Sequence, residues 1–568
     1  MRLLLCLLLF FAGAANAQPT GQHFVSIAFH DVDDRVDQLD TDAVTSKGLA
    51  QFFDWLKGSG WTAISLDDVA AAARGVRPLP DKAILISFDD GYKSLYTRVF
   101  PLLKVYRFPV VAALVGSWME DRPDGTVLYG DRVVPRSNFI TWAEAREMQA
   151  SGLVEMASHS YNLHRGVLAN PQGNNIPAAI TWKYDAATGR YEDDVQYRAR
   201  IRADLEQSRR VMAANLGRAP RALVWPFGRF SRPALEVAKS VGFTFALTLE
   251  PEPAYTSDLY NIHRYFPTRN PSLGEIARNL RFDPADPATR RIACISLDKL
   301  AAAGPGASQD EALGAMIEGL RTLGANVVVI DAQAGSDVPG RPLTEVYFPN
   351  SLLPMRADLL SRVTWQLRTR GSAEAFIRLP LAAAAAAVGE ASVPKLYAEM
   401  MRKAASDGIV LEAPISGGAP RVVVDRTENI RARRAALDPA ALDPGTRLAL
   451  SAYRGAASID PRQRLMLELP VAAGPPDWAD MALLPAASDV SGMAALAGRF
   501  RSEGWLRPEV AGRVAFTLPS DRSMQVEALR RAQRQGASAF ALCPQMPSLP
   551  PAAALSSAFS AATYPYRP

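Results

Sequence analysis

The sequence alternates short apolar runs with longer amphipathic segments, and this alternation restricts the chain to α/β folds. In the first half, the strand-like runs occupy residues 24–29, 83–88 and 110–115, and the helical patterns occupy residues 46–57, 66–74 and 197–216. Strands that alternate with helices form parallel sheets or barrels, where functional side chains gather at the carboxyl ends of the strands. We therefore predict a (β/α) barrel over residues 18–280, with its site at the strand ends.

A second series of the same kind follows a proline-containing interruption. The chain has 568 residues, too many for one ordinary core, and residues 283–289 carry two prolines among small residues. Beyond them, strand patterns occupy residues 291–296, 325–330 and 374–378, and helical patterns occupy residues 310–323 and 355–369. We predict a linker over residues 281–290 and a second (β/α) barrel-like domain over residues 291–568.

The first residues have the pattern of an export signal. Arg2 gives a positive start, residues 3–11 are apolar, and Ala15-Asn16-Ala17 is a typical cleavage sequence, so residues 1–17 are expected to be a cleaved signal peptide. No later stretch is long and apolar enough to span a membrane. Cys6 has too short a segment before it to be a lipoprotein site. We expect a soluble periplasmic protein.

The net charge narrows the range of expected binding partners. The formal net charge of +5 is small for this length and is spread along the chain, which argues against nucleic acid as a partner. We expect neutral or weakly charged partners instead.

Cys294 and Cys543 remain after removal of the signal and lack zinc-ribbon spacing, so they form either one disulfide or two buried thiols, and we favour thiols.

Two adjacent carboxylates, Asp89 and Asp90, follow the predicted strand at residues 83–88, and Gly91 permits a sharp turn after them. Neighbouring residues of a strand point to opposite faces, so one carboxylate can bind a metal ion and the other can accept a proton. The same residues also suit a solvent-exposed turn. The two aspartates therefore indicate a functional site only in combination with the other motifs of the sequence.

Two of the five histidines, His159 and His164, follow another β-like run. That run comes after a helix that starts with the capping-box pattern Thr141-Trp-Ala-Glu144. A step of five residues does not place two side chains on one helical face, so we expect the pair on a loop. Neutral imidazole is the most common nitrogen ligand of zinc and similar ions.

A third motif places Arg221 at the start of a strand that ends in Trp225-Pro226-Phe227-Gly228. A guanidinium group can hold a carboxylate in one orientation, and the N–H of Phe227 can meet an oxyanion. An apolar strand with a turn is the simpler interpretation of this motif alone. The three motifs together predict one site, because one carboxylate and two imidazoles leave a coordination position open for catalysis.

These motifs are similar to those of the polysaccharide deacetylase superfamily, the NodB-homology carbohydrate esterases. The similar residues are Phe88-Asp89-Asp90-Gly91, Ser158-His159-Ser160 with His164, and Arg221 with Pro226. The histidine spacing of five, where four is usual, and Phe29-His30-Asp31-Val32 resemble the branch that acts on poly-β-1,6-N-acetyl-glucosamine, the PgaB type. The resemblance implies a circularly permuted catalytic domain and a C-terminal glycoside-hydrolase-like barrel, to which residues 346–356 and 365–370 are similar.

The resemblance also implies a divalent metal ion bound by Asp90, His159 and His164. Zinc is the default expectation, and cobalt, nickel or iron also suit this set of ligands. The ion would polarise the acetamide carbonyl and activate water.

The remaining roles that the resemblance implies concern protons and charge. Asp89 would be the general base, oriented by Arg221, and the Phe227 amide would bind the oxyanion. His30 would protonate the leaving amine, because the family's late histidine motif falls near the amino end of a permuted domain. His263 is the competing candidate for this proton donor.

The second half departs from relatives whose barrel cleaves the polymer. Their strand after an Asp-Gly-Ile step ends in consecutive aspartates, whereas here it continues as Glu412-Ala413-Pro414. Glycoside hydrolysis ordinarily needs two facing carboxylates. Glu412 can supply one, and we expect Asp331 to be a solvated strand-end residue. Trp365 and Trp478 can stack on sugars but fit a core equally well. We predict that this barrel binds or guides polysaccharide without cutting it, and an active glycosidase is the alternative.

The expected function is N-deacetylation of poly-β-1,6-N-acetyl-D-glucosamine during biofilm exopolysaccharide export, with outer-membrane export machinery as a further partner. The same chemistry on chitin-like chains or peptidoglycan is the second hypothesis. A non-catalytic polysaccharide-binding protein is the third.

Overall fold

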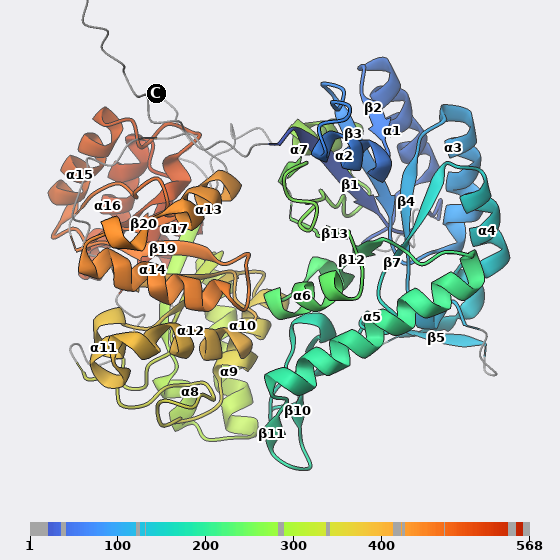
Figure 1. Ribbon diagram of the computed structural model, residues 1–568. Helices are drawn as coiled ribbons and strands as arrows, with labels where there is room; N and C mark the ends of the chain where they lie inside the picture. The colour runs from blue at the N-terminus through green and yellow to red at the C-terminus, as the bar shows by residue number, and fades with distance from the viewer. Residues whose placement is uncertain are drawn as a thin grey trace, which may run out of the picture.

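The computed structural model describes residues 21–35, 41–120, 125–130, 132–250, 252–281, 289–336, 341–412, 422, 427–470, 472–543 and 553–560. Two α/β units lie side by side in it (Figure 1). The expected signal peptide and most of the expected linker lie outside the described residues. No helix of the described residues has the length and apolar character needed to cross a membrane.

A mostly parallel sheet forms the amino-terminal unit, with the strand order β13-β12-β7-β4-β3-β1-β14. Its strands are β1 His23–Phe29, β2 Thr62–Ile64, β3 Ala83–Phe88, β4 Val110–Leu114, β7 Val154–Ser158, β12 Ala222–Val224, β13 Phe245–Leu247 and β14 Ala254–Tyr255. β14 runs antiparallel to β1, and β2 pairs with the first half of β3. Every residue of β3 and β4 is buried, which confirms the buried strands expected from their apolar runs.

Residues 262–265 connect the two ends of this sheet and close it into a barrel. Ile262 forms a parallel bridge to Leu247 at the end of β13, and Tyr265 forms one to Ile27 in β1. The main-chain N–H of Tyr265 donates to the Ser26 oxygen at 2.9 Å. The expected barrel is therefore present, but this short segment closes it in place of a regular strand.

Helices surround the amino-terminal barrel. They are α1 Ser46–Gly58, α2 Leu66–Ala73, α3 Phe100–Tyr106, α4 Trp142–Ala150, α5 Asp194–Leu216, α6 Arg232–Ser240 and α7 Leu273–Arg281. α4 begins with the predicted capping box, in which the Thr141 side chain accepts from the Glu144 N–H and the Glu144 side chain accepts from the Thr141 N–H. α5 ends where expected, at Gly217 with a left-handed φ of 77°.

The second unit is a closed barrel of parallel strands. The strands are β15 Arg290–Ser296, β16 Val327–Asp331, β17 Glu374–Arg378, β18 Gly408–Glu412, β19 Arg464–Glu468, β20 Met481–Leu483, β21 Val514–Thr517 and β22 Ala539–Leu542. The helices are α8 Asp298–Ala302, α9 Ala307–Leu323, α10 Leu360–Thr369, α11 Leu381–Val388, α12 Val393–Arg402, α13 Thr427–Ala436, α14 Pro444–Ala457, α15 Val490–Ser502, α16 Arg522–Arg534 and α17 Ala553–Ser560. α10 begins five residues later than predicted, because Met355 bridges to Val346 instead of joining a helix.

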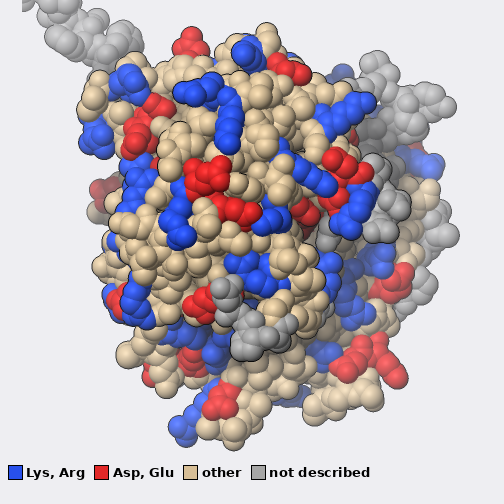
Figure 2. Space-filling model, turned by 90° about the vertical axis from the view of Figure 1, so that its right-hand side faces the viewer, with Lys and Arg blue, Asp and Glu red and all other residues tan. Residues whose placement is uncertain are grey.

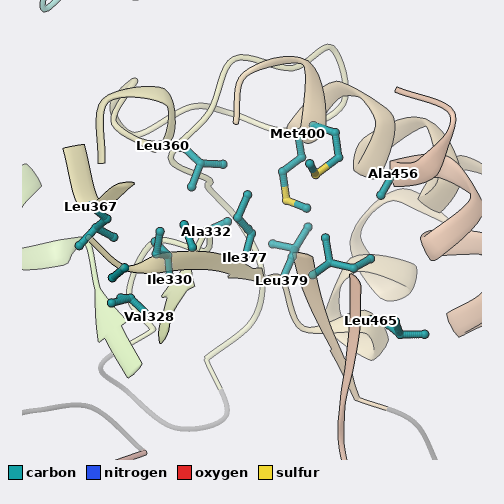
Figure 3. Packing of buried hydrophobic residues seen from close by; sticks show 14 of the residues in the cluster. Val328, Ile330, Ala332, Leu360, Leu367, Ile377, Leu379, Met400, Ala456 and Leu465 are labelled. Carbon is teal, nitrogen blue, oxygen red and sulfur yellow. The ribbon is translucent and has the colours of Figure 1, made fainter. Parts of the chain in front are cut away.

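Alternate residues of the barrel strands face two different cores. On β16, Val327 and Val329 belong to the cluster inside the barrel, whereas Val328 and Ile330 pack outward. Figure 3 shows the outward side chains of β16 and β17 meeting Leu360 of α10 and Met400 of α12. This alternation is the period of two that a β-strand imposes on its side chains.

Cys294 and Cys543 form a disulfide, with 5.2 Å between their Cα atoms. The expectation of two buried thiols is therefore wrong. The two cysteines lie on β15 and directly after β22, which are neighbouring strands of the closed barrel. Closure of the barrel brings together two residues that are 249 positions apart, and no local spacing reveals such a pair.

One apolar cluster continues across the boundary between the two units. It contains Trp225 and Phe230 of the amino-terminal unit together with barrel residues such as Leu360 and Leu396. Polar contacts also join the two units, as in the pairing of Arg402 with Asp194 at 2.5 Å. On the face shown in Figure 2, basic and acidic side chains are interspersed, in keeping with the spread of charge along the sequence.

Candidate metal centre

Two aspartates follow β3, and the backbone turns sharply between them. Asp89 continues the strand pairing, because its N–H donates to the Phe29 oxygen at 2.8 Å. Asp90 and Gly91 both have a left-handed φ of 72°. A non-glycine residue in this region typically costs about 1–3 kcal/mol, and such residues cluster at functional sites. The turn gives the two carboxylates different surroundings, as the sequence analysis expected.

The two histidines lie beside Asp90. Its Oδ1 atom is 3.4 Å from Nε2 of His159 and 3.3 Å from Nε2 of His164, and all three residues are buried. The Nδ1 atom of His159 lies 2.7 Å from the Val224 carbonyl, to which it must donate, so in the neutral imidazole Nε2 keeps its lone pair. The loop expected for the histidine pair is confirmed, since residues 159–165 are not helical.

These residues fit a divalent cation. Asp90 Oδ1 is buried and has no hydrogen-bond partner among the described residues, yet it faces two imidazole nitrogens, and the three ligand atoms lie within 4.8 Å of one another. A buried carboxylate oxygen without a donor is costly unless an ion satisfies it. Among the described residues, this is the one group of three or more His, Cys, Asp or Glu side chains with ligand atoms so close together.

Burial and neighbouring groups favour the protonation states that metal binding requires in His164 and Asp90. Burial lowers the pKa of His164 to about 4 despite the charge of Asp90, so this imidazole is neutral at neutral pH. Burial would raise the pKa of Asp90, but its contacts with the imidazoles of His164 and His159 hold it below its ordinary value. A neutral imidazole and an ionised carboxylate are the forms that bind metal ions.

Asp89 is paired with an arginine that the sequence analysis did not select. Arg264, in the closing segment 262–265, is fully buried, and its Nη1 and Nη2 atoms lie 2.7 and 2.9 Å from the two oxygens of Asp89. Arg264 also donates to Ser87 Oγ at 2.8 Å and to the Thr248 oxygen at 2.9 Å. Burial raises the pKa of Asp89, but the charge and hydrogen bonds of Arg264, together with His159 and His30, outweigh this effect and hold the pKa below its ordinary value. Asp89 is therefore ionised and held in one orientation.

The predicted partner of Asp89, Arg221, lies elsewhere, and that prediction is wrong. Arg221 precedes β12, whereas Asp89 follows β3, so the two residues lie at opposite ends of a parallel sheet. The Arg221 guanidinium pairs with Glu155 at 2.8 Å and with Asp67 at 2.7 Å. An arginine does pair with Asp89, but Arg221 lies at the amino end of its strand, away from the site.

His30 lies next to Asp89, since Phe29 and Phe88 are paired in register on β1 and β3 and each residue follows its strand. Its side chain is largely buried, and its Nδ1 has no hydrogen-bond partner in the part of the chain that the structure describes. Its charge contributes to lowering the pKa of both Asp89 and Asp90. This position suits a proton donor for the same site.

His263 lies in the closing segment next to Arg264. Neighbouring residues of an extended segment point to opposite sides, so His263 faces away from the carboxylate that Arg264 contacts. It is fully buried, and its Nδ1 atom is 3.5 Å from Glu252. The geometry therefore favours His30 over His263 as the proton donor.

Phe227 lies in a tight turn after β12. Its φ is 58°, its ring centroid is 4.4 Å from that of His164, and 41% of its surface is exposed. Gly228 follows with a φ of 64°, and a Cβ atom there would lie 2.5 Å from the Leu249 Cβ. A larger residue therefore does not fit, and the turn keeps its left-handed shape beside the metal ligands.

Aromatic side chains that no motif indicated complete the wall of the site. Tyr129, from the hairpin of β5 Thr126–Tyr129 and β6 Arg132–Pro135, donates to Asp90 Oδ2 at 2.9 Å. The Trp118 ring lies 4.8 Å from the His164 ring in an edge-on arrangement. Both residues come from the connection between β4 and β7, where the sequence carries no spacing that distinguishes them from core aromatics.

The second barrel has a cavity of about 680 Å³ at the carboxyl ends of its strands. Glu412, Glu468 and Arg378 line it together with mostly apolar residues. Arg378 pairs with Asp331 at 2.6 Å and with Glu468 at 3.1 Å. Asp331 is thus buried and paired, and its expected role as a solvated residue is wrong. Glu468, which the sequence analysis did not consider, stands opposite Glu412 in the pairing of β18 with β19.

Comparison with known proteins agrees with these two units. The family model for polysaccharide deacetylase matches residues 76–246, and the model for hypothetical glycosyl hydrolase family 13 matches residues 295–412. The amino-terminal unit is therefore similar to polysaccharide deacetylase domains over residues 76–246, and the barrel that follows is similar to a glycosyl hydrolase family over residues 295–412.

Among curated proteins, the chain is similar to poly-β-1,6-N-acetyl-D-glucosamine N-deacetylase of Escherichia coli (strain K12). The two are 37% identical over 358 residues, which is 63% of this chain and 53% of the relative. The enzyme of the same name from Staphylococcus aureus (strain MSSA476) is 25% identical over 171 residues, 30% of this chain and 49% of the relative. The chain thus spans about half the length of these relatives. Among solved structures, the BpsB deacetylase domain from Bordetella bronchiseptica is 44% identical, covering 43% of this chain and 95% of that domain with a TM-score of 0.40.

Proposed function

We propose that this protein is an exported, metal-dependent polysaccharide N-deacetylase that removes acetyl groups from poly-β-1,6-N-acetyl-D-glucosamine. The observation that carries the proposal is the buried group of Asp90, His159 and His164 beside the Asp89–Arg264 pair, within a polysaccharide deacetylase domain. The substrate follows from the names of the curated relatives. The signal-like residues 1–17 support export to the periplasm.

Asp90, His159 and His164 would hold a divalent cation, with zinc as the default and cobalt, nickel or iron as alternatives. Such an ion supplies Lewis-acid polarisation of a carbonyl and lowers the pKa of water. Each residue brings the ligand atom that the site needs in its neutral or anionic form. Tyr129, whose hydroxyl reaches the other oxygen of Asp90, fixes the orientation of that carboxylate.

The residues of this chain then perform the proton transfers. Asp89, held by Arg264, accepts a proton from the water that attacks the acetamide carbon. The Phe227 N–H stabilises the oxyanion of the tetrahedral intermediate. His30 donates a proton to the leaving nitrogen as the C–N bond breaks, which yields acetate and a free amine. The amine is protonated at neutral pH, so the product polymer is cationic.

For the barrel, we propose that it binds the polymer. Its strand-end cavity combines apolar walls with Arg378, Glu412 and Glu468, a mixture suited to the faces and hydroxyls of sugar rings. A second candidate function, cleavage of glycosidic bonds, is favoured by the two glutamates on neighbouring strands, since such hydrolysis uses two carboxylates. Reducing ends released from partly deacetylated polymer by the wild type, and lost in Glu412→Gln and Glu468→Gln, would establish cleavage.

Acetate release from defined β-1,6 and β-1,4 N-acetylglucosamine oligomers, with and without chelator, tests the main proposal. We expect release from the β-1,6 oligomer that chelator abolishes and added divalent ion restores. Faster release from the β-1,4 oligomer would instead assign a chitin-like or peptidoglycan substrate. No release from either oligomer, together with stable binding of the polymer, would support a polysaccharide-binding protein.

A further inference from the structure

The turn that carries Phe227 is strained and has few contacts of its own to hold it. Phe227 and Gly228 adopt consecutive left-handed conformations, with φ of 58° and 64°. The local hydrogen bonds are short-range: the Gly228 N–H donates to the Trp225 oxygen at 2.9 Å, and the Arg229 N–H donates to the Pro226 oxygen at 3.1 Å. Glycine adopts this conformation without steric cost, whereas the non-glycine residue Phe227 persists in it only when the surroundings fix it.

One fixing contact comes from the other domain. Arg462, two residues before β19 of the barrel, donates from Nη1 to the Gly228 oxygen at 3.2 Å. Asp460 holds the same guanidinium at 3.1 and 3.0 Å, and Glu250 of the deacetylase domain lies 3.4 Å from it. The guanidinium also lies over the Phe230 ring at 5.3 Å.

The neighbouring residues of the barrel reinforce this contact. The Arg232 N–H donates to the Ile459 oxygen at 2.8 Å, and its Nε donates to the Ala457 oxygen at 3.0 Å. Residues 457–462 of the barrel therefore bind the deacetylase segment 228–232 on both sides of Phe230. Arg462 is only 8% exposed, so solvent cannot readily replace its hydrogen bond to Gly228.

We propose that Arg462 is a positioning residue through which the barrel sets the geometry of the deacetylase site. It acts on the Gly228 carbonyl, and the adjacent Phe227 supplies both the amide assigned to the oxyanion and the ring that packs on His164. This inference rests on the proposed function for the role of the Phe227 amide. The barrel then contributes to the chemical step itself and not only to polymer binding.

A purely structural role for Arg462 in docking the domains is the competing account. The chain offers a matched control for it: Arg402 of the barrel pairs with Asp194 of the deacetylase domain at 2.5 Å. This pair joins the same two domains, but Asp194 starts helix α5, far along the chain from the Phe227 turn. Loss of Arg402 should weaken docking without moving the turn.

The test compares full-length Arg462→Met, Arg462→Lys and Arg402→Met with the wild type by hydrogen–deuterium exchange and by acetate release from a short β-1,6 N-acetylglucosamine oligomer. We expect faster exchange at the amides of residues 227–229 in Arg462→Met and not in Arg402→Met. We expect kcat to fall roughly tenfold or more in Arg462→Met, with KM and bound metal unchanged, because a small misplacement at a reacting centre can cost up to about a hundredfold. Arg462→Lys should recover part of both effects.

Exchange at the amides of residues 227–229 that matches the wild type in Arg462→Met would overturn the proposal. Equal effects of Arg402→Met and Arg462→Met on exchange and kcat would also overturn it, in favour of general docking. If Arg462→Met does not fold, Arg462→Lys carries the same comparison, because it keeps the charge and changes only the reach of the donor. A wild type that releases no acetate refutes the proposed function, whereas the exchange result still decides whether Arg462 holds the turn.

Discussion

Replacement of Arg264 by Met should shift the pH dependence of deacetylation, and the structure gives the size of the shift. Arg264 is fully buried and Asp89 is 1% exposed, so water does not screen their two contacts at 2.7 and 2.9 Å. Removal of one partner of a buried pair typically costs about 3–5 kcal/mol. At about 1.36 kcal/mol for each pKa unit, 3 kcal/mol corresponds to roughly two units. The Asp89 carboxyl group avoids the cost by binding a proton.

The sign follows from the same contacts. In the wild type the pKa of Asp89 lies below its ordinary value, so this proposed base stays ionised as the pH falls until that lowered pKa is reached. Without Arg264, only His159 and His30 oppose the effect of burial, so the pKa rises and Asp89 is protonated at a higher pH. The acidic limb of the kcat/KM profile should therefore move upward by about two units or more. Acetate release measured from pH 4 to 9 at constant metal loading gives this profile.

Three controls make the result decisive. Arg221→Met removes a guanidinium that is 36% exposed, and such a pair contributes about 0–1 kcal/mol, so its profile should match the wild type. Arg264→Lys keeps a charge and serves if the Met variant is unstable. The Asp89→Asn variant should lose nearly all activity but retain metal. In this background Arg264→Met should not lower the residual kcat/KM further. An unchanged acidic limb in Arg264→Met, or a larger effect of Arg221→Met, would refute the assigned pairing.

Three other predictions concern the metal and the stability of the barrel. His159→Ala should lose the stoichiometric divalent ion found by elemental analysis of the wild type together with acetate release, and an ion retained at full occupancy would contradict the ligand assignment. Gly455→Ala should lower the free energy of unfolding in urea by about 1–3 kcal/mol, because the new Cβ would lie 2.2 Å from a backbone oxygen of α12. Gly498→Ala, with nothing within 4 Å, should stabilise instead, and equal effects of both changes would contradict this packing. A reductant should lower the free energy of unfolding by about 2–4 kcal/mol, which is measured as a lower Tm. The double Ala variant of Cys294 and Cys543 should show no such response.

Much of the fold and part of the site follow from local patterns in the sequence. Apolar runs predict strands such as β3 and β15 within a residue or two, and the Thr141 capping box marks the start of α4. The ligand residues Asp90, His159 and His164 could be selected because each directly follows, or lies in the loop after, a buried strand. Parallel strands bring their carboxyl ends to one edge, so side chains chosen in this way meet.

The residues that sequence reasoning missed depend on contacts that are remote in the chain. Arg264 follows a segment too short to give a strand pattern, and only the closure between β13 and β1 brings it to Asp89. Arg221 has a longer strand after it, but it stands at the amino end, where strand direction excludes it from the site. The end of the strand on which a residue lies therefore carries more information than the residue type. The direction of β12 places Arg221 at the amino end of its strand and so excludes it as the partner of Asp89. The arginine that contacts Asp89 is Arg264, next to His263.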